Sequence, residues 1–130
     1  MTAGNIEVAF GTALVSVVNN AAWPVFPATR DGQVPDDSCV IVRCENARHL
    51  AGGFYQADIE VMVVSSSLVT GEVETALGIA QEIHNWLRDT PGASGSGFTL
   101  AGVHVTNSLS IEADRRWMQT IAFTCGLRPQ

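Results

Sequence analysis

The side chains that could carry chemistry are spread along the sequence and form no recognised motif. Six of them have the sulfur or nitrogen atoms that bind zinc: Cys39, Cys44, Cys125, His49, His84 and His104. A structural zinc site needs four such ligands, and these residues lack the closely paired spacing that usually supplies them. Cys39 and Cys44 fall on opposite faces of a predicted strand, which disfavours a disulfide between them. We therefore expect three buried, reduced thiols, with no metal and no cofactor.

Two other patterns resemble catalytic or binding motifs. Asp58 and Glu60 share one face of a predicted strand, where paired carboxylates could act as general acid and base. Charged residues that alternate along the wet face of a strand are the better interpretation. The sequence PGASGSG (residues 91–97) lacks the Lys of a phosphate-binding loop and follows a predicted helix, so it predicts a flexible linker. His84 is interpreted as a solvated helix residue, and no catalytic residue is predicted.

The length of 130 residues is typical of one domain, so residues 1–130 are predicted to fold as a single unit. Hydrophobic residues make up 46% of the chain and charged residues only 15%, whereas about a quarter of an average protein is charged. A surface with so few charges is either rich in Ser, Thr, Asn and Gly or partly covered by partner subunits. We favour the second interpretation, which predicts an oligomer.

The charges that are present argue against a free-standing DNA-binding protein. The formal net charge is −6, from 13 acidic and 7 basic residues, whereas affinity for DNA depends mainly on Lys and Arg. Every basic residue is Arg, the cation that interfaces favour, although a genome rich in G and C is the simpler explanation. No apolar run reaches the roughly 20 residues of a membrane span, and the N-terminus lacks the basic start of a secretion signal. We expect a soluble protein made in a cytoplasm, with no membrane partner.

The clearest structural pattern is a strand over residues 54–64, around which the rest of the fold is expected to pack. Apolar and polar residues alternate along it, which is typical of a strand with one buried face and one wet face. The apolar side carries Tyr55, Ala57, Ile59, Val61 and Val63, and the polar side carries Gln56, Asp58 and Glu60. This strand is therefore placed in the interior of the sheet.

Two segments, residues 5–19 and 70–89, have the spacing of amphipathic helices. The second begins at the capping residue Thr70, has Glu72 in its first turn, and carries an apolar stripe that includes Leu77. The Pro-Gly pair that follows it is expected to end the helix. We predict that both helices pack against the sheet.

The remaining segments predict an extended connector and three further strands. Residues 21–37 contain three prolines, which forbid a helix, and their aromatic residues Trp23 and Phe26 are expected to be buried against the domain or a neighbouring chain. The strands are predicted over residues 38–45, 98–111 and 116–127. The first forms a hairpin with the strand over residues 54–64. The other two are joined by a turn at residues 112–115, and the first of these is bent at Asn107.

The order of these elements predicts the fold class. Helix, strand, strand, helix, strand, strand gives an α+β two-layer domain, with two helices packed on one face of a mainly antiparallel four-stranded sheet. Exposed hairpin tips reach beyond a domain, and Arg is enriched at interfaces, so these features predict contacts with a partner. The candidates are Arg48 and His49 at the first hairpin tip, Phe54 at the start of the next strand, and Arg115 and Arg116 at the turn into the last strand.

The same order of features resembles the tail terminator or tail-completion (neck) proteins of long-tailed bacteriophages. The resemblance covers nearly the whole chain and is a pattern of elements, without a short diagnostic motif. It comprises a short first helix, the connector WPVFPATRDGQVP, the strands SCVIV and YQADIEVMVVSSS, the helix ending HNWLRD, and the final strand RRWMQTIAFTCGL.

The resemblance implies a structural virion protein and not an enzyme. It implies a ring, a homohexamer, that caps the tail tube, ends its polymerisation and joins the tail to the head connector. The implied partners are the tail tube protein and a head-completion or connector protein, with DNA passing through the lumen without specific binding. The implied location is the tail or neck of the virion, assembled in the host cytoplasm. The alternatives are another phage neck or tail-completion component, or, from a different class, a small α+β enzyme or ligand-binding module.

Overall fold

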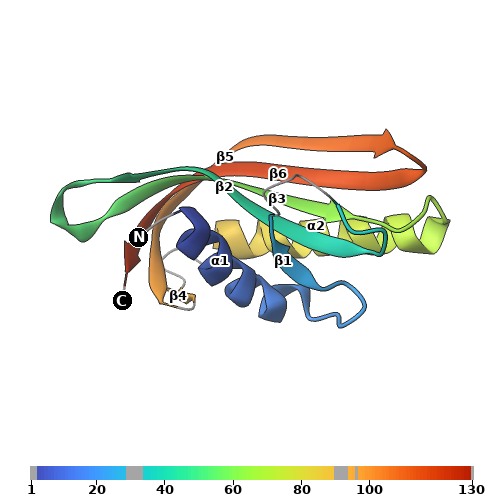
Figure 1. The fold of residues 1–130 in the computed structure, drawn as a ribbon, viewed down its shortest axis with the longest axis horizontal. Helices are drawn as coiled ribbons and strands as arrows, with labels where there is room; N and C mark the ends of the chain where they lie inside the picture. The colour runs from blue at the N-terminus through green and yellow to red at the C-terminus, as the bar shows by residue number, and fades with distance from the viewer. Residues whose placement is uncertain (1–2, 29–33, 90–93, 96, 130) are drawn as a thin grey trace.

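The computed structural model describes residues 3–28, 34–89, 94–95 and 97–129 (Figure 1). These residues contain two α-helices, one short 3₁₀ turn and six strands. The helical elements are α1 (Ala3–Val18), η1 (Ala51–Gly53) and α2 (Thr70–Asp89). The strands are β1 (Val25–Pro27), β2 (Cys39–His49), β3 (Tyr55–Val64), β4 (Ser94–Gly95), β5 (Phe98–Ala113) and β6 (Arg116–Pro129). Neither α-helix is long and apolar enough to cross a membrane, within the residues described.

The strands form one sheet in the order β1-β2-β3-β6-β5-β4. β1 runs parallel to β2, and the other neighbouring pairs are antiparallel. The predicted four-stranded, mainly antiparallel sheet with two helices packed on one face is therefore wrong. The sheet has six strands of mixed direction, and it curls around the helices (Figure 1). The four predicted strands are its central members, β2, β3, β6 and β5.

The first unpredicted strand, β1, lies within the proline-rich connector. The Val40 N–H donates to the Pro24 carbonyl at 2.9 Å, and the Ala28 N–H donates to the Val42 carbonyl at 2.8 Å. Prolines are tolerated in β1 because it is an edge strand, where few backbone N–H groups are needed for pairing. A segment that cannot form a helix can thus still extend a sheet.

The second unpredicted strand, β4, falls within PGASGSG, where the sequence predicts a flexible linker. Its residues Ser94 and Gly95 pair with Thr99 and Phe98 of β5. The remainder of that sequence, apart from Gly97, lies outside the described residues, as does the predicted helix stop at the Pro-Gly pair.

Irregular pairing along β5 accounts for the curl of the sheet. The register of β5 against β6 shifts between Leu100 and Gly102, and again between Val105 and Asn107. Bulges of this kind bend a strand and increase its local twist. The second shift coincides with the predicted bend at Asn107. The curl brings β4 into contact with α1, so the sheet wraps around the first helix.

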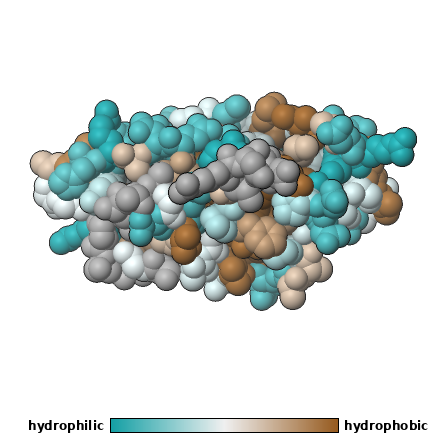
Figure 2. All heavy atoms as spheres, in the orientation of Figure 1, coloured by the Kyte–Doolittle hydropathy of each residue, from teal (hydrophilic) through white to brown (hydrophobic). Residues whose placement is uncertain are grey.

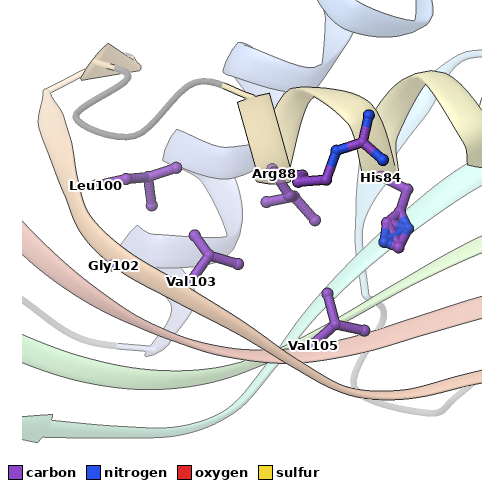
Figure 3. A pocket seen from close by; sticks show the side chains of 7 residues that line it. His84, Arg88, Leu100, Gly102, Val103 and Val105 are labelled. Carbon is purple, nitrogen blue, oxygen red and sulfur yellow. The ribbon is translucent and has the colours of Figure 1, made fainter.

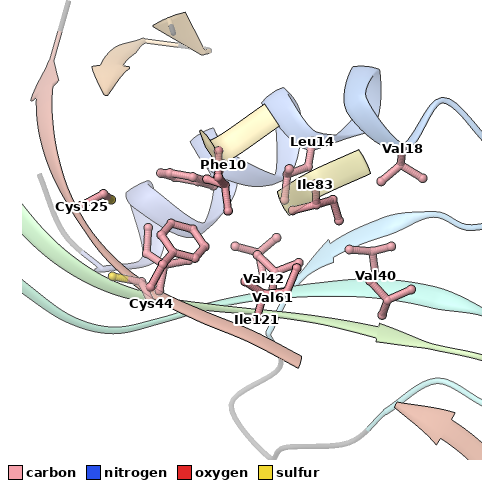
Figure 4. Packing of buried hydrophobic residues seen from close by; sticks show 14 of the residues in the cluster. Phe10, Leu14, Val18, Val40, Val42, Cys44, Val61, Ile83, Ile121 and Cys125 are labelled. Atoms are coloured by element: carbon pink, nitrogen blue, oxygen red, sulfur yellow. The ribbon is translucent and has the colours of Figure 1, made fainter. Parts of the chain in front are cut away.

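The core lies between the helices and the inner face of the sheet, which is the face toward the helices (Figure 4). From the helices it contains Ile6, Phe10, Leu14 and Val18 of α1, and Ala76, Ile79, Ala80, Ile83 and Leu87 of α2. The inner side of β3 contributes Ala57, Ile59, Val61 and Val63, each at most 2% exposed. The predicted alternation of this strand is therefore confirmed.

Three large apolar residues show where the sequence pattern was less informative. Trp23 of the connector is buried in the core, whereas Phe26 of the same connector is exposed. Leu77, which the sequence places in the apolar stripe of the second helix, is also exposed. The stripe on α2 is thus narrower than predicted.

Candidate interaction surfaces

The first group of predicted contact residues lies at the tip of the β2–β3 hairpin, which projects at one end of the molecule (Figure 1). Arg48 and His49 are exposed there, and Phe54 is partly buried. A side-chain nitrogen of Arg48 donates to the side-chain oxygen of Gln56, its cross-strand partner. The His49 ring meets the edge of the Tyr55 ring, with centroids 4.9 Å apart. These contacts orient the polar side chains of the tip.

The second group, Arg115 and Arg116, lies at the turn between β5 and β6, at the other end of the sheet (Figure 1). Arg115 is exposed and has a positive φ of 61°, as does Asp114 before it at 53°. Paired left-handed residues of this kind are typical of a tight hairpin turn. The structure therefore brings Arg48, His49 and Phe54 together but places both turn arginines far from them.

Arg116 makes contacts within its own chain. Its Nε donates to the carbonyl of Ser65 at 2.7 Å, and its Nη2 donates to the carbonyl of Asp37 at 3.0 Å. The guanidinium thus links the start of β6 to the end of β3 and to the segment before β2. These contacts indicate that Arg116 stabilises the fold of its own subunit.

Next to Arg116 lies a polar cluster that the sequence did not reveal, formed by Ser38, Ser66 and Glu72. The Ser38 hydroxyl donates to Glu72 Oε2 at 2.6 Å and accepts from the Ser66 N–H at 3.1 Å. The Ser66 hydroxyl also donates to Glu72 Oε2, at 3.3 Å. Ser38 and Ser65 are both buried. The only signal in the sequence was a run of serines, which is indistinguishable from an ordinary loop.

All three cysteines are buried and free, as the sequence predicts. Burial raises the pKa of the Cys44 thiol to about 11, and the carboxylate of Glu7 adds to this effect. Burial also raises the pKa of Cys125, to about 12, and that of Cys39 is raised for the same reason. Such thiols are poor nucleophiles because almost none of the reactive thiolate forms near neutral pH.

We expect Cys44 and Cys125 to react with iodoacetamide at pH 8 at least about 100-fold more slowly in the folded protein than in urea, because the thiolate is scarce and covered. The folded state also holds these protons more tightly than the unfolded state. This contribution to stability is therefore complete below the ordinary pKa of 9.0 and is lost as the pH rises toward 11–12. Mass spectrometry of alkylated peptides measures the first effect, and urea titrations at pH 8 and 10 measure the second. Equal labelling rates in the two states would contradict this interpretation.

The other residues with catalytic potential are also dispersed. No group of three or more His, Cys, Asp or Glu that could hold a metal occurs within the described residues. Asp58 accepts a hydrogen bond from the Thr124 hydroxyl at 2.9 Å, and Glu60 lies opposite Arg43 in the sheet. Both carboxylates therefore belong to cross-strand residue pairs on the outer face of the sheet, which is the face away from the helices.

Two shallow hollows lie between α2 and the strands β5 and β6, and Figure 3 shows the first of them. The first, of about 230 Å³, is bordered by His84 and Arg88 of α2 and by Leu100, Val103 and Val105 of β5. The second, of about 190 Å³, also includes His84. His84 is thus partly buried between two open hollows, instead of solvated on the helix surface as predicted. The second hollow is lined by both His84 and Ser108, and the Ser108 hydroxyl accepts a hydrogen bond from the Gln119 side-chain amide at 3.4 Å.

The outer face of the sheet has a polar half and an apolar half. Cross-strand pairing places Gln56, Asp58, Glu60 and Thr124 in the half nearer the β2–β3 hairpin. The same pairing places Met62, Leu109, Ile111 and Met118 in the half nearer the β5–β6 turn. Leu109 is 46% exposed and Ile111 is 40% exposed. On the molecular side shown in Figure 2, hydrophobic residues likewise appear in groups among hydrophilic ones.

The sheet also has two open edges within the described residues. β4 pairs only with Phe98 and Thr99, so residues 102–113 of β5 have a neighbouring strand on the β6 side alone. β1 pairs only with residues 40–42, so residues 43–49 of β2 have a neighbouring strand on the β3 side alone. We call these stretches the β5 edge and the β2 edge. Sequence patterns do not reveal such edges, because an open edge arises where a neighbouring strand is shorter than the strand it pairs with.

Comparison with known proteins finds matches among solved structures only. No protein-family model matches the sequence, and no curated protein matches it. Among solved structures, the chain aligns with one chain of the virion of a native gene transfer agent particle. The alignment covers 96% of this chain and 91% of that one, with 15% sequence identity and a TM-score of 0.49.

Proposed function

We propose that this protein is a structural virion component, with residues 1–130 acting as one domain. In this proposal it forms a homohexameric ring that caps the tail tube, ends its polymerisation and joins the tail to the head connector. The observation that carries the proposal is the distribution of exposed apolar residues over several sides of the molecule. Val8 and Val15 of α1 are 57% and 56% exposed, and Leu109 and Ile111 are exposed on the outer face of the sheet.

A ring subunit needs surfaces on several sides. Two different lateral surfaces must meet in each contact between neighbours, and two axial surfaces must meet the tube and the connector. α1 packs over β1 and β2, so its exposed valines lie in the helix layer, whereas Leu109 and Ile111 lie on the opposite side of the sheet. Apolar residues on separate sides of a weakly charged chain suit a subunit that is covered by several neighbours.

The proposal also describes the interaction of the ring with DNA. DNA passes through the lumen of the ring without specific binding, and the net charge of −6 favours sliding over adhesion because like charges repel. The tail tube protein and a head-completion or connector protein are the axial partners. A lumen that proved to be basic in the assembled particle would contradict this part of the proposal.

The direct test of termination is an electron micrograph of tails assembled without this protein. Unlimited tube growth is the expected result, because nothing would cap the last tube ring, and addition of the purified protein should restore a uniform length. Tails of normal length that fail to join heads would instead indicate another neck or tail-completion component. A role as a small-ligand module is favoured by the hollows between α2 and the strands β5 and β6, and ligand binding there without any effect on tails would support it.

Replacing Arg48 and Arg115 together by Glu is expected to leave the fold intact and to weaken assembly by about tenfold or more, which corresponds to roughly 1.4 kcal/mol. Both side chains are exposed at the two ends of the sheet, so the reversal costs little inside the subunit. Analytical ultracentrifugation measures assembly, and circular dichroism monitors the fold. The matched control replaces both residues by Lys, which keeps the charge. Unchanged assembly of the Glu variant would remove these residues from the interface.

A further inference from the structure

The β5 edge has the properties of a strand that is completed by another strand. Residues 102–111 read GVHVTNSLSI, without a proline and without a formally charged residue. Edge strands of monomeric proteins are usually short or carry Lys, Pro or other features that prevent pairing with another chain. Here the bulge near Asn107 is the main irregularity, and beyond it residues 107–113 pair with β6 without interruption. Within the described part of the chain, no strand pairs with the N–H and C=O groups on this side, and these groups form a ready template for one more strand.

The β2 edge is the second open stretch within the described residues and lies on the opposite side of the same sheet. β2 is antiparallel to β3, β3 to β6, and β6 to β5, so β2 and β5 run in opposite directions. A second copy in the same orientation would therefore place its β2 edge antiparallel to the β5 edge of the first. This arrangement continues the alternation already present in the sheet. The β2 edge, residues 43–49, spans a length similar to that of the uninterrupted stretch at 107–113.

We propose that the β5 edge of one copy pairs with the β2 edge of the next copy, so that the sheets of neighbouring subunits become continuous. The proposal deepens the ring of the proposed function and rests on it. The contact is heterologous, because it joins two different surfaces, and repetition of it produces a closed ring when the rotation between copies closes. This pairing also gives the projecting β2–β3 hairpin a role, because β2 is the strand of the hairpin that pairs with the neighbouring copy (Figure 1).

If two copies paired through the same edge, fewer backbone N–H and C=O groups in each subunit would gain a hydrogen-bond partner. A two-fold contact between two β5 edges would close as a dimer and leave the β2 edge of each copy open. Pairing of β5 with β2 satisfies both edges in every subunit. An added strand also covers the flanks of Leu109 and Ile111, which are exposed beside the β5 edge. Backbone pairing and apolar burial therefore favour the same contact.

Hydrogen exchange of the full chain tests the pairing. We compare the dilute protein with the protein at its highest soluble concentration, and again with purified tail tubes present. Amides within residues 43–49 and 102–113 are expected to exchange at least about tenfold more slowly in the assembled state, because new hydrogen bonds protect them. Native mass spectrometry gives the number of subunits in the same samples.

The outcomes separate this inference from the proposed function. A ring in which neither edge gains protection overturns the edge pairing and leaves the ring intact. A dimer with protection of the β5 edge alone overturns it in favour of the two-fold contact. A monomer with unchanged exchange under every condition overturns both the pairing and the ring.

A pair of proline variants provides a second test. Adjacent residues of a strand direct their N–H groups to opposite sides, so one of Leu109→Pro and Ser110→Pro removes a hydrogen bond to β6 and the other removes a group on the open edge. The variant that keeps the wild-type melting temperature is expected to lose assembly, because proline is tolerated on an open edge but blocks a new strand there. Wild-type assembly by that folded variant would overturn the proposal.

Discussion

Replacing Phe10 by Ala is expected to lower the free energy of unfolding by about 3–5 kcal/mol, a large part of the 5–15 kcal/mol that stabilises a typical domain. Phe10 is fully buried, and its ring is stacked on Phe98 with centroids 4.8 Å apart. The same ring lies 5.8 Å from Phe123 of β6 and meets Trp86 of α2 edge-on at 6.2 Å. Phe10 therefore joins α1, α2, β5 and β6 at one point, and its removal leaves a cavity among rings that cannot easily collapse.

The control for Phe10 lies on the same helix. Val15 is 56% exposed, so Val15→Ala removes little buried surface and is expected to change the stability by less than about 0.5 kcal/mol. Urea denaturation followed by tryptophan fluorescence and by circular dichroism measures both variants. A loss below 1 kcal/mol for Phe10→Ala would show that α1 is not the element that closes the core.

The elements with strong periodicity were predictable from the sequence, and their bounds are close to those observed. Thr70 and the acidic first turn place the start of α2, and alternation places β3, because each of these signals is local. The pairing of β2 with β3 and of β5 with β6 also follows from short connections. Local patterns therefore identified the four central strands of the sheet.

The errors in fold class arose where tertiary context overrides local preference. Pro24 and Pro27 indicate a connector, and only the neighbouring edge of β2 converts that segment into β1. Ser94 and Gly95 have weak strand propensity, yet β5 pairs with them as it turns around α1. The curl of the sheet depends on bulges, and a bulge changes the register without a distinctive residue type.

The candidate surfaces were predictable only in part. A hairpin tip is local, so the grouping of Arg48 with His49 and Phe54 followed from the sequence. The inward contacts of Arg116 did not, because the carbonyls of Ser65 and Asp37 come from distant parts of the chain. The open edges of β2 and β5 likewise depend on where β1 and β4 end. Such features depend on how all the strands pair, so no single segment of the sequence predicts them.

The polar cluster around Glu72 gives the second large effect on stability. It fastens the start of α2 to the start of β2 and to the loop after β3, through the hydroxyls of Ser38 and Ser66. Glu72 also lies in the first turn of α2, where a negative charge is stabilised by the helix dipole. Ser38 is buried, so water cannot readily replace the carboxylate as an acceptor for its hydroxyl.

Replacing Glu72 by Ala is therefore expected to lower the free energy of unfolding by about 1–3 kcal/mol, because two hydrogen bonds to a charged group are lost and a buried hydroxyl is left without its acceptor. Glu72→Gln is the matched control, since its amide oxygen can still accept from Ser38 and only the charge is lost, so it should recover more than half of the stability. Urea denaturation at pH 7 measures both variants, and hydrogen exchange at the start of β2 should accelerate in the Ala variant alone. Equal losses in the two variants would assign the effect to charge at the helix terminus, and no loss in either would show that the cluster contributes nothing to the attachment of α2.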